Sequence, residues 1–60
     1  MTTQQFDNIG FKANMKAMYN GKEFDVITVD FEEKLIALED PLFPEETKWV
    51  RCENCEIINL

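Results

Sequence analysis

The chain has no histidine, two glycines, two prolines and two cysteines, so the residues of several common functional sites are missing. Without histidine there is no side chain whose ordinary pKa lies near neutrality, and the usual general base of enzymes is absent. Gly10 and Gly21 are isolated, which excludes a glycine-rich phosphate-binding loop. No apolar run exceeds four residues, whereas a membrane-spanning helix needs about 20.

The small size limits function further. Sixty residues lie near the lower limit for a domain that folds without disulfides or a metal, so nearly every apolar side chain must be buried. A separate catalytic cleft would leave too little core, and we expect a non-enzymatic protein without a cofactor. The N-terminus lacks the apolar segment of a signal peptide, which predicts a cytoplasmic location where thiols stay reduced.

The charge is acidic and unevenly distributed. Twelve acids against six bases give a net charge of −6, yet residues 1–22 carry +2 and residues 23–60 carry −8. An acidic surface repels phosphate backbones and anionic headgroups, which disfavours nucleic acid and membranes as partners. The acidity either keeps a small domain soluble or forms a face that meets a basic protein or mimics nucleic acid.

The hydrophobic pattern predicts strands rather than helices. Residues 1–9 are mostly polar apart from Phe6 and predict a flexible N-terminal arm, followed by one domain over residues 10–60. Apolar residues alternate over 11–19, and Asn20-Gly21 is a strong signal for a tight hairpin turn. A β-rich second strand spans 23–31, where a break in alternation between Val26 and Ile27 predicts a bulge.

The second half predicts three more strands. A tight turn at 31–34 precedes a strand at 35–39, and residues 40–47 are expected not to pair because Pro41 and Pro44 lack donors. A fourth strand at 48–52, a 3-10 turn at 53–55 and a fifth strand at 56–59 follow. The predicted core comprises Met15, Ala17, Val26, Val29, Ile36, Leu38, Val50, Cys55 and Ile57.

Five short strands with a 3-10 turn before the last resemble an SH3-like barrel. The resemblance covers residues 10–60 and depends on the Asn20-Gly21 hairpin and the segments VITVDFEEKLIAL and WVRCENCEII. It is greatest to small SH3-like proteins of bacteria and phages, many of unassigned function. It implies an all-β, five-stranded small barrel and specifies no activity. The tyrosine-rich loop of polyproline-binding SH3 domains is missing, so that function is not carried over.

Cys52 and Cys55 form a C-x-x-C pattern. Zinc requires four ligands, so this pair would need carboxylates or a second copy of the chain to complete a site. A redox pair would need a helix N-terminus in an α/β fold. We therefore interpret both cysteines as structural, with Cys55 packed beneath the 3-10 turn.

The most suggestive functional feature is the proline-bounded loop around Leu42 and Phe43. These two side chains either plug one end of the barrel or form an exposed apolar anchor within an acidic rim, as many interaction surfaces do. Trp49 has the same ambiguity, since it can cap the core or flank a groove. We predict a protein-binding surface that comprises Leu42, Phe43, Trp49, Asp40, Glu45 and Glu46.

Two other functions stay open. Exposed strand edges could pair between copies in a homo-oligomeric assembly subunit, because a small domain gains burial by self-association. Alternatively, a stripe of Lys12, Lys16 and Lys22 near Tyr19 or Phe11 could bind nucleic acid, although the overall acidity opposes this.

Overall fold

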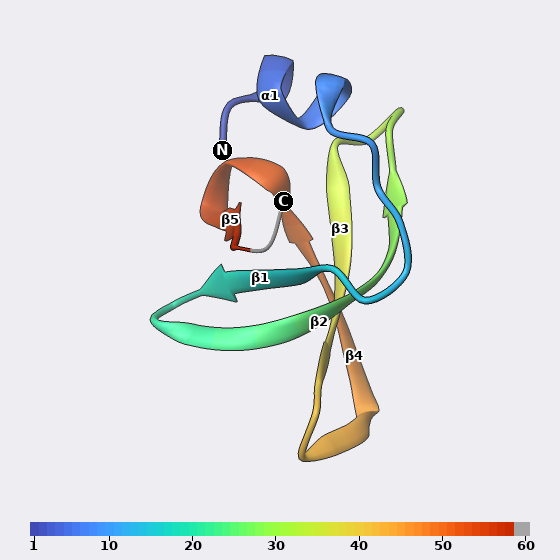
Figure 1. The fold of residues 1–60 in the computed structure, drawn as a ribbon, viewed down its shortest axis with the longest axis vertical. Coiled ribbons are helices and arrows are strands. Elements are labelled where there is room, and N and C mark those ends of the chain that lie inside the picture. The colour runs from blue at the N-terminus through green and yellow to red at the C-terminus, as the bar shows by residue number, and fades with distance from the viewer. Residues whose placement is uncertain (59–60) are drawn as a thin grey trace.

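The computed structural model describes residues 1–58, which form one five-stranded antiparallel sheet and a short N-terminal helix (Figure 1). The strand order is β4-β3-β2-β1-β5, and a 3-10 turn precedes the last strand, as the sequence predicts. No helix in this part of the chain has the length and apolar content to cross a membrane. The elements are α1 (Thr3–Asn8), β1 (Lys16–Tyr19), β2 (Lys22–Asp30), β3 (Leu35–Asp40), β4 (Phe43–Arg51), η1 (Cys52–Asn54) and β5 (Cys55–Ile57).

The first hairpin has the predicted turn and bulge. Asn20 and Gly21 both have positive φ, 52° and 76°, and connect β1 to β2 with Tyr19 opposite Lys22. The register of β2 against β3 shifts between Val26 and Thr28, which confirms the bulge. Strand β1 is shorter than predicted and begins at Lys16, because Asn14 adopts a left-handed conformation with φ 70° that interrupts extended backbone.

Strand β4 differs from the sequence-based prediction because it begins at Phe43 rather than at residue 48. Phe43 lies opposite Asp40, and an irregularity in the β3–β4 register between Glu39 and Asp40 accommodates the following residues of β4. Strand β4 is at one edge of the sheet, where only one side of the backbone pairs. An edge strand therefore tolerates Pro44. The expectation that residues 40–47 cannot pair was wrong for 40, 43 and 47.

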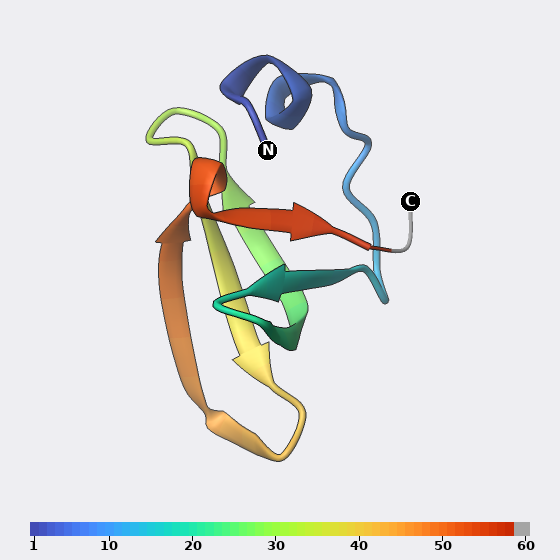
Figure 2. The same ribbon diagram turned by 90° about the vertical axis from the view of Figure 1, so that its left-hand side faces the viewer.

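The N-terminal residues pack on the domain, in contrast to the loose arm expected for residues 1–9. A capping box begins α1: the Gln5 N–H donates to Thr2 Oγ1 at 3.1 Å, and the Thr2 N–H donates to Gln5 Oε1 at 2.9 Å. Phe6 is fully buried, with its ring 5.4 Å from that of Phe11 and 5.1 Å from that of Phe31. Helix α1 also contacts η1, and both ribbon views show it at that end of the sheet (Figures 1 and 2).

The α-ammonium group of Met1 adds a second connection to the same end of the sheet. It donates to the carbonyl oxygens of Cys52 at 3.2 Å and Cys55 at 2.7 Å, and it forms an ion pair with Glu56. These carbonyl groups belong to η1 and the start of β5, so the first residue of the chain is joined to the last strand.

The core agrees largely with the prediction. Six of the predicted core residues are buried, namely Met15, Ala17, Ile36, Leu38, Val50 and Cys55. Val26, Val29 and Ile57 are half-buried and pack against this cluster. Phe6, Phe24 and Cys52 belong to the core as well, although the sequence analysis did not place them there.

Candidate functional site

The tip of the β3–β4 hairpin is exposed and lies at the end of the molecule opposite α1 (Figures 1 and 2). Leu42 is 78% exposed and Phe43 is 57% exposed. Neither side chain therefore plugs the core, because the hairpin extends beyond it. This leaves the exposed apolar anchor as the arrangement that the structure supports.

Asp40 holds the tip in place. It was predicted to lie on the exposed rim, and this prediction was wrong because the side chain is buried. It is only 7% exposed, its Oδ2 pairs with Lys22, and its Oδ1 accepts from the Leu42 N–H at 2.9 Å. The hydrogen bonds from Lys22 and Leu42 lower the pKa of Asp40 below its ordinary value. Asp40 therefore joins the β3–β4 tip to the start of β2.

A groove of about 360 Å³ lies between the two hairpins. Its apolar surface comes from three aromatic side chains and its polar surface from charges of both signs. The residues that line it are Tyr19, Asn20, Lys22, Phe24, Asp40, Phe43, Glu46 and Lys48. The predicted site residues Phe43, Asp40 and Glu46 are thus brought together, and the β1–β2 hairpin supplies the opposite wall.

Stacked lysines and aromatic rings order the groove. Lys48 Nζ lies 5.3 Å from the ring centroid of Phe24 and 5.9 Å from that of Tyr19, and Lys22 Nζ lies 5.5 Å from that of Phe24. The rings of Tyr19 and Phe24 meet edge to face at 6.2 Å. Each such contact contributes about 0.5–1.5 kcal/mol, so the groove is formed before any ligand arrives.

A second, smaller hollow of about 270 Å³ lies at the tip itself. It is lined by Leu42, Phe43, Pro44, Glu45 and Glu46. The carboxylates of Glu45 and Glu46 make no ion pair with any residue that the structure describes. Two unneutralised carboxylates therefore stand beside the exposed apolar anchor.

Trp49 is separated from the other predicted site residues. It is 52% exposed and lies opposite Ala37 of β3, whereas its neighbours Lys48 and Val50 face the groove and the core. Successive side chains of a strand point to opposite faces of the sheet. Trp49 is therefore on the outer face, and the predicted surface divides into a groove side and an outer side.

The cysteines are packed thiols. Cys52 and Cys55 are both buried and free, and Cys55 Sγ lies 3.8 Å from the carbonyl oxygen of Cys52. Burial raises the pKa of both thiols, which keeps them protonated and unreactive at neutral pH. Within residues 1–58, no group of three or more metal-ligating side chains is placed to hold a metal ion.

The lysine stripe of the nucleic-acid alternative is partly neutralised. Lys16 pairs with Asp25, and Lys22 pairs with Asp40. Paired ammonium groups gain less from a phosphate backbone, because the carboxylate must be displaced. The arrangement therefore favours a structural role for these two lysines.

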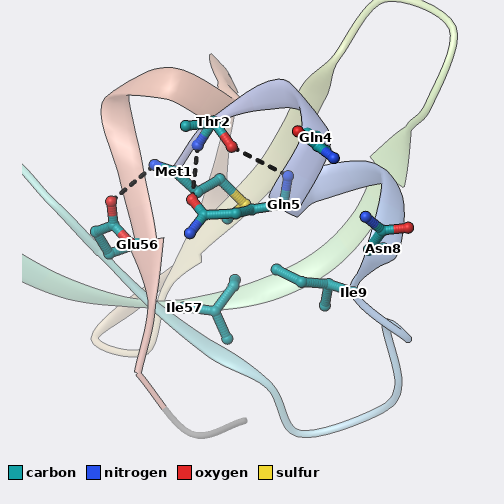
Figure 3. A pocket seen from close by; sticks show the side chains of 8 residues that line it. All are labelled: Met1, Thr2, Gln4, Gln5, Asn8, Ile9, Glu56 and Ile57. Atoms are coloured by element: carbon teal, nitrogen blue, oxygen red, sulfur yellow. Dashed lines mark hydrogen bonds and ion pairs between the residues drawn. The ribbon is translucent and has the colours of Figure 1, made fainter.

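A hollow of about 590 Å³ lies at the seam between α1 and β5 (Figure 3). Gln5 and Glu56 face this seam, but Gln5 caps α1 and Glu56 pairs with the Met1 ammonium group. These polar groups already have partners that hold the helix on the sheet. We therefore interpret the hollow as part of the packing of α1.

No protein-family model, curated protein or solved structure matches this chain. The function is consequently inferred from the geometry alone. The groove and the acidic tip provide that geometry. Phe24 and Lys48 complete the groove, although neither was among the residues predicted for the site.

Proposed function

We propose that this chain is a small, non-enzymatic protein-interaction module that binds a basic segment of another protein through the groove and the acidic tip. The observation that carries the proposal is the exposure of Leu42 and Phe43 beside the unpaired carboxylates of Glu45 and Glu46. The strand order and the 3-10 turn support an SH3-like barrel as the scaffold. A cytoplasmic location agrees with two free thiols.

The chemistry of the site defines the partner. The aromatic groove accepts one large apolar or aromatic side chain, and Glu45 and Glu46 attract lysine or arginine next to that anchor. Pro41 and Pro44 restrict the loop, and Asp40 fixes its base, so little conformational entropy is lost on binding. The expected ligand is an extended segment with a bulky side chain flanked by basic residues.

Selection from a library of random peptides tests this proposal directly. We expect the wild-type chain to enrich peptides with an aromatic or large aliphatic residue beside lysine or arginine. The Phe43→Ser variant should bind the selected peptides roughly tenfold more weakly or worse, as measured by fluorescence anisotropy. Trp49→Ser is the matched control, because it removes a similarly exposed aromatic side chain from the other face of β4.

Two outcomes would overturn the proposal. One is the failure of the wild-type chain to enrich any peptide class. The other is equal loss of binding in the Phe43 and Trp49 variants. Replacement of Glu45 and Glu46 by glutamine should also weaken binding at low salt and remove most of its salt dependence, since these carboxylates supply the attraction.

A further inference from the structure

The outer edge of β4 is a second surface, which borders the groove at Glu46 and Lys48. Strand β4 is nine residues long, with residues 47–51 paired regularly to β3 and an irregular part at 44–46. Residues 43–49 are exposed on both faces of the sheet. In the part of the chain that the structure describes, only β3 pairs with it. Exposed edge strands of this length are ready to pair with another strand, and natural proteins usually protect them.

The charges along this edge are arranged in opposite halves. Glu45 and Glu46 lie in the first half of β4, and Lys48 and Arg51 lie in the second half. A strand with this pattern is complementary to itself when it runs antiparallel, because the acidic half of each copy then lies beside the basic half of the other. The pattern therefore indicates a second copy of the same chain as the occupant.

We propose that two copies pair through β4 in an antiparallel ladder centred on Thr47. In an antiparallel ladder, hydrogen-bonded and non-hydrogen-bonded residue pairs alternate. A two-fold axis preserves this alternation only when it passes through a pair formed by the same residue of both copies. Thr47 is the midpoint of Phe43–Arg51 and the residue at which regular pairing with β3 ends, because residues 44–46 have no partner in β3. This register also places Glu46 opposite Lys48 of the second copy, twice in each dimer.

Neighbouring registers are less favourable. Centring on Glu46 brings two glutamates face to face, and centring on Lys48 brings two lysines face to face; both arrangements are destabilising. In the Thr47 register two threonines meet at the axis, and Glu45 lies diagonally opposite Arg51 of the second copy. Pro44 lies near each end of the ladder, where its missing N–H removes at most one hydrogen bond per copy.

Charge exchange tests the pairing. We expect the wild-type chain, untagged and reduced, to form dimers in sedimentation at micromolar to millimolar concentration. Glu46→Lys and Lys48→Glu should each weaken the dimer by roughly tenfold, because each places like charges opposite one another twice. The double variant should restore it. Glu33→Lys, an equal charge change in an exposed turn, is the control and should have no effect.

Cysteine crosslinking tests the register. Residues opposite each other in a ladder have Cβ atoms about 4.5–5.5 Å apart, within reach of a disulfide after a small shift. Thr47→Cys should therefore form disulfide-linked dimers under mild oxidation much faster than Glu45→Cys or Trp49→Cys. Far-UV circular dichroism verifies that each variant is folded, and mass spectrometry shows that the buried native thiols are not involved.

The results distinguish this proposal from the groove. A wild-type chain that stays monomeric at millimolar concentration overturns the dimer, as does a double charge variant that fails to recover. Preferential crosslinking through residue 45 or 49 overturns the register. Peptide selection by the groove is tested separately with the Phe43→Ser variant, so a chain that stays monomeric can still select peptides.

Discussion

Removal of the Phe6 ring tests whether the N-terminal helix belongs to the domain. Phe6 is fully buried and contacts the rings of Phe11 and Phe31. Truncation of a buried phenylalanine to alanine costs about 3–5 kcal/mol in the free energy of unfolding. A 60-residue domain has roughly 3–9 kcal/mol in total, so Phe6→Ala should remove a third of the stability or more.

Urea denaturation followed by far-UV circular dichroism measures this effect under reducing conditions. Phe6→Leu keeps most of the buried volume and should cost about 1.5 kcal/mol or less. Gln4→Ala changes an exposed residue of the same helix and should alter the free energy of unfolding by no more than about 0.5 kcal/mol. The order of the three variants separates burial of the ring from the helical propensity of α1.

A loss below about 1 kcal/mol for Phe6→Ala would refute the reasoning, since it is far less than truncation of a buried ring requires. Residues 1–9 would then behave as the loose arm that their polarity suggests. The packing of α1 over η1 would contribute little to the fold.

Three further predictions concern Asp40, Gly21 and the two cysteines. Lys22 and the Leu42 N–H lower the pKa of Asp40 below 3.8, so the stability from this carboxylate is present above pH 3.8 and is lost as the pH falls through the folded-state pKa. In thermal melts from pH 2 to pH 6, Asp40→Asn should therefore remove this part of the loss of stability at acid pH. An unchanged dependence on pH would contradict the prediction. Gly21→Ala should lower the free energy of unfolding by about 1–2 kcal/mol in urea titrations, because φ is 76° at this position even though no atom lies within 4 Å of the added Cβ. A neutral effect would argue against the positive φ of this turn. Iodoacetamide should alkylate Cys52 and Cys55 only after unfolding, as read by intact mass, and rapid labelling of the native chain would disprove their burial.

The first hairpin shows what short-range sequence can predict. Asn20-Gly21 fixes a two-residue turn, and that turn fixes the pairing of β1 with residues 22–25 of β2. Ala17, a predicted core residue, lies opposite Phe24 in that register. Cross-strand partners share a face, so the burial of Phe24 could have been derived from the same signal.

The start of β4 and the docking of α1 depend on information that a linear pattern does not contain. Proline is excluded from central strands but tolerated at an edge, and the strand order is set by the whole sheet. Helix α1 has six residues, too few for a periodic pattern, and it is stabilised by contacts between Phe6 and the distant Phe31. The Thr2-x-x-Gln5 capping box was the local signal that could have indicated it.

Only part of the candidate site could be predicted from the sequence, because the rest depends on pairing between distant residues. The proline-bounded loop marked Leu42 and Phe43, but their exposure follows from the length of the hairpin, which only the pairing of residues 43 and 47 reveals. Asp40 was placed on the rim because it flanks the proline-bounded loop and acidic side chains favour solvent. Its partner Lys22 lies 18 residues away, beyond the reach of a local pattern.

Alternation along β4 connects the two proposals. Val50 is in the core, so Lys48 shares its face and Trp49 has the other face. Glu46 lines the groove together with Lys48. Glu46 and Lys48 therefore stand at the rim of the groove and at the edge that would pair with a second copy. If a dimer joins Glu46 to Lys48 of the other copy, it neutralises a carboxylate that would attract a basic peptide. Peptide binding and dimerisation must then oppose one another. Peptide should weaken the affinity of the dimer by the same factor by which dimerisation weakens the affinity for peptide.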